Sequence, residues 1–268
     1  MEDGCAVADL DHDGGLKSVA SAIELLDLFA TEEELGVSQV ARKLGVAKST
    51  AHRLLTTLCN GGLVEQNPEN GRYRLGLRLF ELGHLALSRM ELRRESRALL
   101  EEMREVSGLT VHLAVAQGAD TLFLERLVTL RGMNAMSEYR RRWPLHATSS
   151  GKVICAYDPV AAQARIEAGF PALTPYTIST KEAFIAELAR IRQRGYATAN
   201  QEVMLQLASV AAPIVDARGI ARAAVSITGS VHDISANPDR LGRLVVSAGH
   251  RLSRIVQHKT TAVAARRV

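Results

Sequence analysis

Polar and apolar side chains follow helical spacing between residues 48 and 58. The polar ones stand at positions i, i+3, i+4 and i+7 and are Ser49, His52, Arg53 and Thr56. The apolar ones repeat the same spacing and are Ala51, Leu54, Leu55 and Leu58. In one helix the polar groups project along one line, away from the leucine stripe. Hydroxyl, imidazole and guanidinium groups suit base edges in the major groove of DNA, although a lone helix with such a face is more often simply solvated.

The preceding residues decide between these interpretations. Ser38 offers an N-cap oxygen to a short helix that carries Val40, Ala41 and Leu44, and Gly45 ends it. The next helix begins near Lys48, and two helices joined by a short turn with glycine are typical of a helix-turn-helix. An earlier helix from Ser18 is expected to pack on them with one apolar face made of Val19, Ile23, Leu26 and Ala30, widened by Ala22, Leu25 and Phe29.

A hairpin is predicted directly after these helices. Residues 63–66 and 72–75 read as two short strands, and the Asn70-Gly71 pair favours the positive φ angles of a turn. Alternation puts Tyr73 and Leu75 on the core side and Arg72 and Arg74 on the other, where they would form a wing over the phosphate backbone. A plain hairpin with solvated arginines is the alternative.

Local charge supports a nucleic-acid partner more than total charge does. The formal net charge is only +4, but residues 38–78 hold seven basic side chains (Arg42, Lys43, Lys48, Arg53, Arg72, Arg74, Arg78) against Glu65 and Glu69. The residues expected to contact DNA are Ser38, Lys48, Ser49, Thr50, His52, Arg53, Thr56, Arg72 and Arg74.

Length and composition set the domain plan. The 268 residues, 47% of them hydrophobic, suffice for a small and a medium core. We expect a disordered acidic leader over 1–15, the winged helix-turn-helix over 16–77, a helical linker over 78–107, a larger domain over 108–258 and a flexible basic tail over 259–268. Three distant cysteines without a CxxC pair argue against disulfides and zinc. No apolar run would span a membrane and no signal core is visible, so a cytoplasmic protein is expected.

The linker is predicted as one long helix or two consecutive ones, ended by Gly108. Leu79, Leu82 and Ala86 face one side of its first part, and Leu99, Met103 and Val106 of its second. These apolar residues would pack on their own domain or pair with a second subunit.

The larger domain mixes hairpins with helices. Residues 111–116 with 121–128, and 210–215 with 220–228, predict two hairpins. Helices are expected from Asp158 and Pro159, from a Ser179 and Glu182 capping box to Gly195, and from Asn237 and Pro238. This pattern favours an α+β protein, with a sheet flanked by helices.

A candidate ligand loop lies at residues 148–152, before a helical stretch that ends near Tyr157. Free amides at a helix start can bind a carboxylate, although an ordinary N-cap is the simpler interpretation. Glycine spacing before Gly151 and Lys152 excludes a P-loop.

The segments "KSTAHRLL", "GRYRLG", "PLHATSSGK", "RGYATANQE" and "AAPIVDARGIARAAVSITG" resemble, in this order, the isocitrate lyase regulator (IclR) family over residues 17 to 258. The resemblance implies a GAF-like α/β effector domain behind the winged helix-turn-helix, with the effector in a cleft between the 148–152 loop and later strands. The matching positions are Ser149, Ser150, Asn200, Ser209, Ser226 and Thr228.

Hydroxyls and amides at these positions suit a small organic or aromatic acid. Two positions depart from the family pattern: Gln206 stands where a glycine is frequent, and Ser209 stands where some relatives have cysteine. Leu122, Phe123 and Met133 are candidates for apolar walls or for plain core.

Two other function classes fit the sequence less well. An enzyme would need a nucleophile with a base, or metal ligands, but His112 and His146 stand alone and Cys155 lies in an apolar helix, so no catalytic residue, metal or cofactor is expected. The N-terminal domain could instead bind protein. The favoured expectation is a homodimer, or a dimer of dimers, on an inverted-repeat DNA operator, modulated by a small-molecule effector.

Overall fold

The computed structural model describes residues 16–129 and 142–265. The chain divides into two compact units, residues 1–89 and residues 90–268. This division falls inside the predicted linker, which forms two helices: α4 (Leu77–Ser88) in the first unit and α5 (Glu91–Ser107) in the second.

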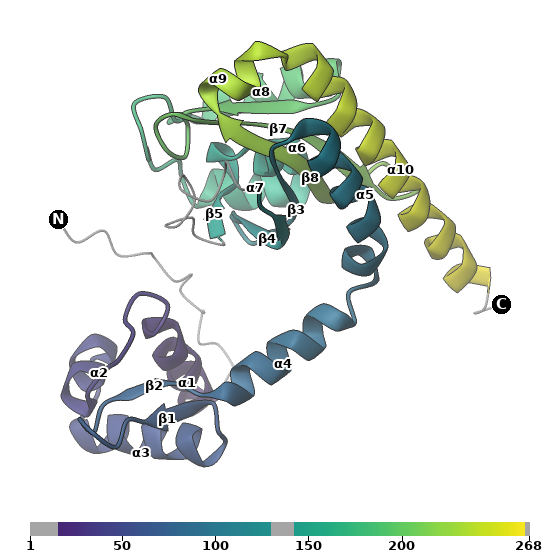
Figure 1. Cartoon of the computed structure of the whole chain (residues 1–268). Coiled ribbons are helices and arrows are strands. Elements are labelled where there is room, and N and C mark those ends of the chain that lie inside the picture. Colours follow the sequence, from purple (N-terminus) through teal and green to yellow (C-terminus); the bar gives the residue numbers. More distant parts are fainter. Residues whose placement is uncertain (1–15, 130–141, 266–268) are drawn as a thin grey trace. The chain divides into compact units, whose positions relative to one another are not determined.

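Over its described residues the first unit holds the helices α1 to α4 and a hairpin (Figure 1). The helices are α1 (Lys17–Leu28), α2 (Val37–Leu44) and α3 (Lys48–Asn60), and the strands are β1 (Val64–Gln66) and β2 (Tyr73–Leu75). The strands are antiparallel, and Leu35 bridges to Tyr73 on the other edge of β2. The core is built from Leu25, Phe29, Leu35, Val40, Ala51, Leu55, Leu58, Val64 and Tyr73.

Two glycines set the geometry of this unit, and the role of Gly45 was predicted from the sequence. Gly45 takes a left-handed φ of 64° and ends α2 before the turn into α3. Gly76 joins β2 to α4 where a Cβ atom would collide with the carbonyl of Gly62, so only glycine fits there.

Four local expectations in this unit were wrong. The N-cap of α2 is Gly36, so Ser38 lies inside the first turn. Positive φ in the hairpin turn occurs at Gly71 and not at Asn70. Leu75 is exposed, although Val64, its partner across the hairpin, is buried. On α1 the buried face runs through Leu25 and Phe29, which leaves Val19 (51%) and Ile23 (46%) exposed.

A six-stranded antiparallel sheet forms the centre of the second unit, in the order β5-β4-β3-β8-β7-β6. The strands are β3 (Thr110–Gln117), β4 (Asp120–Leu127), β5 (Arg142–Pro144), β6 (Ala197–Asn200), β7 (Leu207–Val215) and β8 (Ala221–Ser230). Both predicted hairpins are present, as β3 with β4 and β7 with β8.

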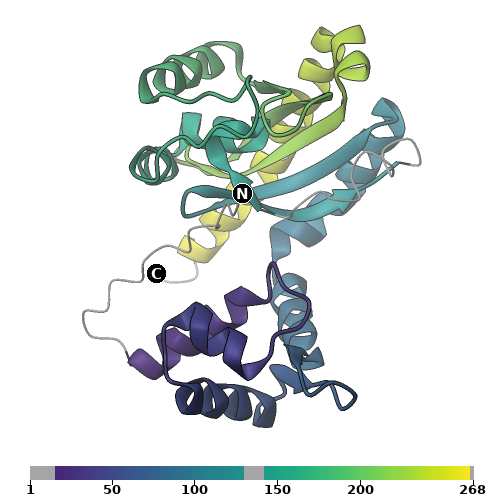
Figure 2. The same ribbon diagram turned by 90° about the vertical axis from the view of Figure 1, so that its left-hand side faces the viewer.

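Helices cover both faces of this sheet, with α5 and α10 on one face and α6, α7 and α8 on the other (Figures 1 and 2). The helices that follow the first hairpin are the 3₁₀ turn η2 (Leu145–Ala147), α6 (Ser149–Tyr157), α7 (Pro159–Glu167), α8 (Lys181–Arg194), α9 (Val231–Ala236) and α10 (Pro238–Ala265). The α+β class is therefore confirmed.

Three details of this unit differ from expectation. The cap of α8 is Thr180, whose hydroxyl accepts from the Ala183 N–H, and not Ser179. Helix α10 continues to Ala265, so residues 259–265 are helical and not a flexible tail. Val106 is exposed, whereas Leu99 and Met103 are buried as predicted. The leader over 1–15 lies outside the described residues.

Candidate nucleic-acid interface and ligand cavity

The polar side of α3 is on the surface of its unit. All six predicted contact residues of this helix are exposed: Lys48, Ser49, Thr50, His52, Arg53 and Thr56. Behind them Ala51, Leu55 and Leu58 are buried in the core. The apolar stripe thus fixes the rotation of the helix, and the donors and acceptors remain free for a partner.

The two arginines of the wing have different surroundings. Arg74 is exposed and pairs with Glu65 directly across the hairpin, with 2.6 Å between Nε and Oε1. Arg72 is half-buried, and its Nη2 donates to the Glu34 carbonyl at 2.8 Å and to Gln39 Oε1 at 3.0 Å. Arg72 therefore fastens the wing to the start of α2, whereas Arg74 lies on the accessible side.

Glu34 also holds the wing, and no local pattern in the sequence could predict this because its partners are 33 and 36 residues away. Its two carboxylate oxygens accept from Asn67 Nδ2 at 2.8 Å and from Asn70 Nδ2 at 2.7 Å. The hydrogen bond from Asn67, with that from Asn70, lowers the pKa of Glu34 below its ordinary value. The turn of the wing is thus held to the segment before α2.

Ser38 is exposed beside this cluster. Its predicted capping role belongs to Gly36 and Gln39, since the Gly36 N–H donates to Gln39 Oε1 at 2.9 Å. Ser38 therefore reaches the surface without a capping bond.

A cavity of about 20 Å³ lies in the second unit, where the start of α6 meets β7 and β8. Five of the six predicted effector residues line it: Ser149, Ser150, Ser209, Ser226 and Thr228. Asn200 does not line it and is exposed, because alternation along β6 turns Ala199 toward the cavity in its place. Of the predicted apolar walls, Phe123 lines the cavity, Leu122 does not, and Met133 lies outside the described residues.

The start of α6 is tightly held. Thr148 Oγ1 accepts from the Gly151 N–H at 2.9 Å and lies 2.8 Å from Thr121 Oγ1, so the N-cap interpretation of this loop is correct for Thr148. A Cβ on Gly151 would collide with the Leu145 carbonyl and with Thr121 Oγ1, which explains the glycine. Ser149 Oγ, 2.7 Å from Ser209 Oγ, ties α6 to β7.

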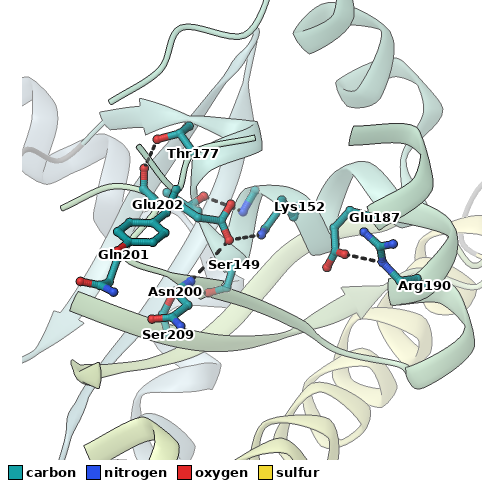
Figure 3. A network of polar contacts seen from close by, with 12 residues as sticks. Ser149, Lys152, Thr177, Glu187, Arg190, Asn200, Gln201, Glu202 and Ser209 are labelled. Atoms are coloured by element: carbon teal, nitrogen blue, oxygen red, sulfur yellow. Dashed lines mark hydrogen bonds and ion pairs between the residues drawn. The ribbon is translucent and has the colours of Figure 1, made fainter. Parts of the chain in front are cut away.

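A buried ion pair beside the cavity was not predicted from the sequence. Lys152 is 2% exposed, and its Nζ donates to Glu202 Oε1 at 2.6 Å; Figure 3 shows the two side chains pointing toward each other. Burial lowers the pKa of Lys152 and raises that of Glu202, but their contact favours both charged forms. The available signal was a lysine in the apolar run from Gly151 to Ala156, since a buried charge needs a partner.

Two histidines, His112 and His146, and the buried cysteine Cys155 are held neutral. Burial, with the charge of Arg126, lowers the pKa of His112 to about 3, and its Nδ1 lies 3.4 Å from Thr228 Oγ1 beside the ring of Phe123. Burial lowers the pKa of His146 to about 4 and raises that of Cys155 to about 12. These groups carry no charge at neutral pH.

Within residues 16–129 and 142–265 the structure contains no cluster of three or more potential metal ligands. No helix in this part of the chain is long and apolar enough to cross a membrane.

Family models match both units. The IclR helix-turn-helix domain matches residues 18–68, and the bacterial transcriptional regulator IclR C-terminal domain matches residues 84–254. The transcriptional regulator XynR of Escherichia coli is 34% identical over 216 residues, which are 80% of this chain and 86% of the relative. A glycerol operon regulatory protein of Streptomyces coelicolor is 37% identical over 233 residues, 87% of this chain and 92% of the relative.

Solved structures agree with these matches. A putative IclR regulator from a Silicibacter species shares 28% identity with a TM-score of 0.77, over 89% of this chain and 96% of that one. An IclR homologue from Microbacterium hydrocarbonoxydans, complexed with 4-hydroxybenzoate, shares 26% identity with a TM-score of 0.73, over 89% of this chain and 99% of that one. This chain therefore belongs to the IclR family of bacterial transcriptional regulators, with an N-terminal helix-turn-helix and a C-terminal ligand-binding domain.

Proposed function

We propose that this regulator binds an inverted-repeat operator as a homodimer, with α3 in the major groove, and that a small carboxylic acid in the cavity of the second unit changes its affinity for the operator. The observation that carries the proposal is the helix α3, whose leucine stripe is buried and whose hydrogen-bonding side is exposed. A chromosomal operator as partner implies that the protein works in the cytoplasm.

The DNA contacts divide by position on the first unit. Ser49, His52, Arg53 and Thr56 lie along the exposed line of α3 and read base edges. Lys48 and Thr50, in the first turn of α3, and Ser38, in that of α2, suit phosphate oxygens. Arg74 reaches a phosphate by exchanging its partner Glu65. Arg72 acts by holding the wing and not by contacting DNA.

Exposed apolar residues of the first unit support a second copy as partner. On α4 no residue is buried, and Leu77 (77%) and Phe80 (72%) are among the most exposed large apolar side chains of the described residues. Val19 and Ile23 add to them on α1. Such residues on a DNA-binding unit suit a symmetric interface that sets two recognition helices about 34 Å apart, one turn of DNA.

The cavity chemistry supports a small acid. Four serines and two threonines are among the lining residues. The first amides of α6, those of Ser149 and Ser150, have no acceptor within the helix and lie where a carboxylate would find them. Because about 20 Å³ holds little more than one water, the effector must widen the cavity as it binds, and that movement can be coupled to the DNA-binding unit.

Arg53→Ala tests the DNA contact. We expect it to cost about 1 to 3 kcal/mol on the preferred duplex and to relax the preference at one base pair of each half-site, measured by titration of fluorescent duplexes. The control is Arg97→Ala, which removes the same charge from an exposed position on α5 of the second unit. Equal losses on all duplexes, or equal losses for both variants, would show that α3 does not read sequence.

Ser226→Ala tests the cavity. Ser226 is buried and lines it, so the variant should weaken effector binding about fivefold, the worth of one hydrogen bond, while operator affinity without effector stays unchanged. Ser96→Ala is the control, since Ser96 is equally buried but bonds to the Arg93 carbonyl on α5. An effector response that survives Ser226→Ala unchanged removes the cavity from the proposal.

A further inference from the structure

Glu202 has one carboxylate oxygen that its ion pair does not use. Oε1 accepts from Lys152 Nζ at 2.6 Å and from the Asn200 N–H at 3.4 Å. Oε2 is buried and has no hydrogen-bond partner among the described residues. A buried carboxylate oxygen without a donor is costly, because nothing replaces the water that it lost on folding.

Glu202 is among the residues that line the ligand cavity, and it is only 9% exposed. Among the polar groups nearby, Ser149 Oγ and Ser209 Oγ bond with each other, and Thr177 Oγ1 donates to the Glu202 carbonyl. A molecule that enters the cavity is therefore a candidate source of the donor that completes this carboxylate.

Its neighbours oppose the effect of burial on Glu202 and hold the side chain in place. Lys152 on α6 supplies the opposing charge at 2.6 Å, and Lys152 also lies in the field of Glu187 on α8, which in turn pairs with Arg190 and Arg194 (Figure 3). Thr177 holds the backbone of Glu202 from the loop before α8, through a 2.6 Å bond to its carbonyl. A fixed carboxylate is an acceptor only, so it discriminates between ligand groups that donate and groups that only accept.

We propose that Glu202 is a specificity-determining residue whose Oε2 accepts a hydrogen bond from the effector, so that the cavity selects short hydroxy-carboxylates over the corresponding oxo-carboxylates. The inference rests on the proposed effector function and gives it a ligand class. The carboxylate of the effector accepts from the amides of Ser149 and Ser150, and its hydroxyl donates to Glu202 Oε2. An oxo group offers only an acceptor there and leaves Oε2 without a donor, beside a second lone pair that repels it.

The test is a binding comparison on the full chain by isothermal titration calorimetry. The probes are three pairs that differ only in hydroxyl against carbonyl: lactate with pyruvate, 2-hydroxybutyrate with 2-oxobutyrate, and 4-(hydroxymethyl)benzoate with 4-formylbenzoate. Glycerol serves as a hydroxyl donor without a carboxylate. For at least one pair the hydroxy member should bind about tenfold or more tightly, the value of one hydrogen bond to a charged group.

Glu202→Gln is the decisive variant. Its amide oxygen can still accept from Lys152, which leaves an NH₂ donor in place of Oε2, so the preference should disappear or reverse toward the oxo member. Glu187→Gln is the matched control: it also removes a buried carboxylate near Lys152, but it does not line the cavity, and the hydroxy preference should persist. If Glu202→Gln does not fold, the preference of the unchanged chain for hydroxy over oxo probes still tests the proposal.

Each outcome separates this inference from the function on which it rests. Equal binding of both members, or tighter binding of the oxo member, by the unchanged chain overturns the role of Glu202 and leaves the acid effector standing; in that case Oε2 binds only water. A hydroxy preference that persists in Glu202→Gln also overturns it. Binding of glycerol but of no acid, lost in Glu202→Gln, supports Glu202 and overturns the acid effector. No binding of any probe at 10 mM, roughly the weak limit for ligands of this size, overturns both.

Discussion

At the residue scale, exposure and partners decide which polar side chains are available for function. His52 and Arg53 were predicted from helical spacing alone, and the structure exposes them because the leucine stripe faces the core. Arg72 looked equivalent to Arg74 in the sequence, yet it is engaged inside its unit. Such long-range partners, like Glu202 for Lys152, carry no local spacing signal, and this is why they were missed.

Arg72→Ala should therefore destabilise the first unit, by about 1 to 3 kcal/mol, because two acceptors lose a charged donor. Arg74→Ala should leave stability almost unchanged, since exposed pairs contribute little, and should instead lower the salt dependence of DNA binding by about one phosphate contact. Thermal unfolding and salt titrations of both variants measure this division. It is wrong if Arg72→Ala unfolds at the same temperature as the unchanged chain.

Gln206→Gly should stabilise the second unit. Gln206 has a φ of 64°, a conformation that glycine adopts without the steric cost that other residues bear, so the departure from the family glycine is a local strain. We expect a gain of up to about 1 kcal/mol in the free energy of unfolding, partly offset by the greater freedom of glycine in the unfolded chain.

The comparison is Gln201→Gly, which has a similar φ of 59° but loses the side-chain oxygen that accepts from the Gln206 N–H. This variant should gain less or lose stability. A larger gain at Gln201 than at Gln206 in denaturant melts would contradict the strain argument.

At the element scale, the sequence predicted the long helices and the hairpins, but it did not predict β5, β6 or α9, and it erred at the ends of several elements. Periodicity marked α3, both hairpins of the large sheet and α10, because long regular patterns outweigh single residues. Caps failed by one or two positions: Gly36 in place of Ser38, and Thr180 in place of Ser179. Several polar residues near the start of a helix can serve as its N-cap. Tertiary contacts, such as the hydrogen bond from Arg72 to Gln39, determine where the helix begins.

The wing is the element with a predictable pH dependence. The lowered pKa of Glu34 means that its bonds to Asn67 and Asn70 stabilise the folded unit above the ordinary value of 4.5, and that this contribution is lost as pH falls through the lower folded value. Glu34→Gln removes this contribution at neutral pH. The difference in the free energy of unfolding between the unchanged chain and the variant should therefore shrink in acid.

Hydrogen exchange of the Leu35 and Tyr73 amides, which bond across this junction, is the appropriate measurement. Glu33→Gln, at the exposed neighbouring position, is the matched control and should exchange like the unchanged chain. A protection difference for Glu34→Gln that stays constant from pH 7 to pH 3 would contradict the account.

At the scale of the whole molecule, a DNA-binding unit and a ligand-binding unit are joined where the sequence predicted one helical linker. The break between α4 and α5 leaves α4 with the first unit, without a buried residue of its own. The sequence could not distinguish packing on the same chain from packing on a second subunit, because the apolar pattern is the same in both cases.

Phe80→Glu should disrupt the proposed dimer. A charge in an apolar interface loses its hydration, so the variant should sediment as a monomer at concentrations where the unchanged chain is a dimer, and its operator affinity should fall. Val160→Glu changes an equally exposed apolar residue on α7 and should have no effect. If Phe80→Glu sediments like the unchanged chain, the dimer does not use α4.

The most direct measurement is selection of duplexes from a random DNA pool by the full chain at physiological salt. The account predicts enrichment of one sequence with two inverted half-sites whose centres lie about one helical turn, roughly 10 base pairs, or a multiple of it apart. The same selection with Arg53→Ala should lose information at one base pair in each half-site. A pool that stays random, or an enriched sequence that is identical for both proteins, would contradict the claim that α3 reads DNA.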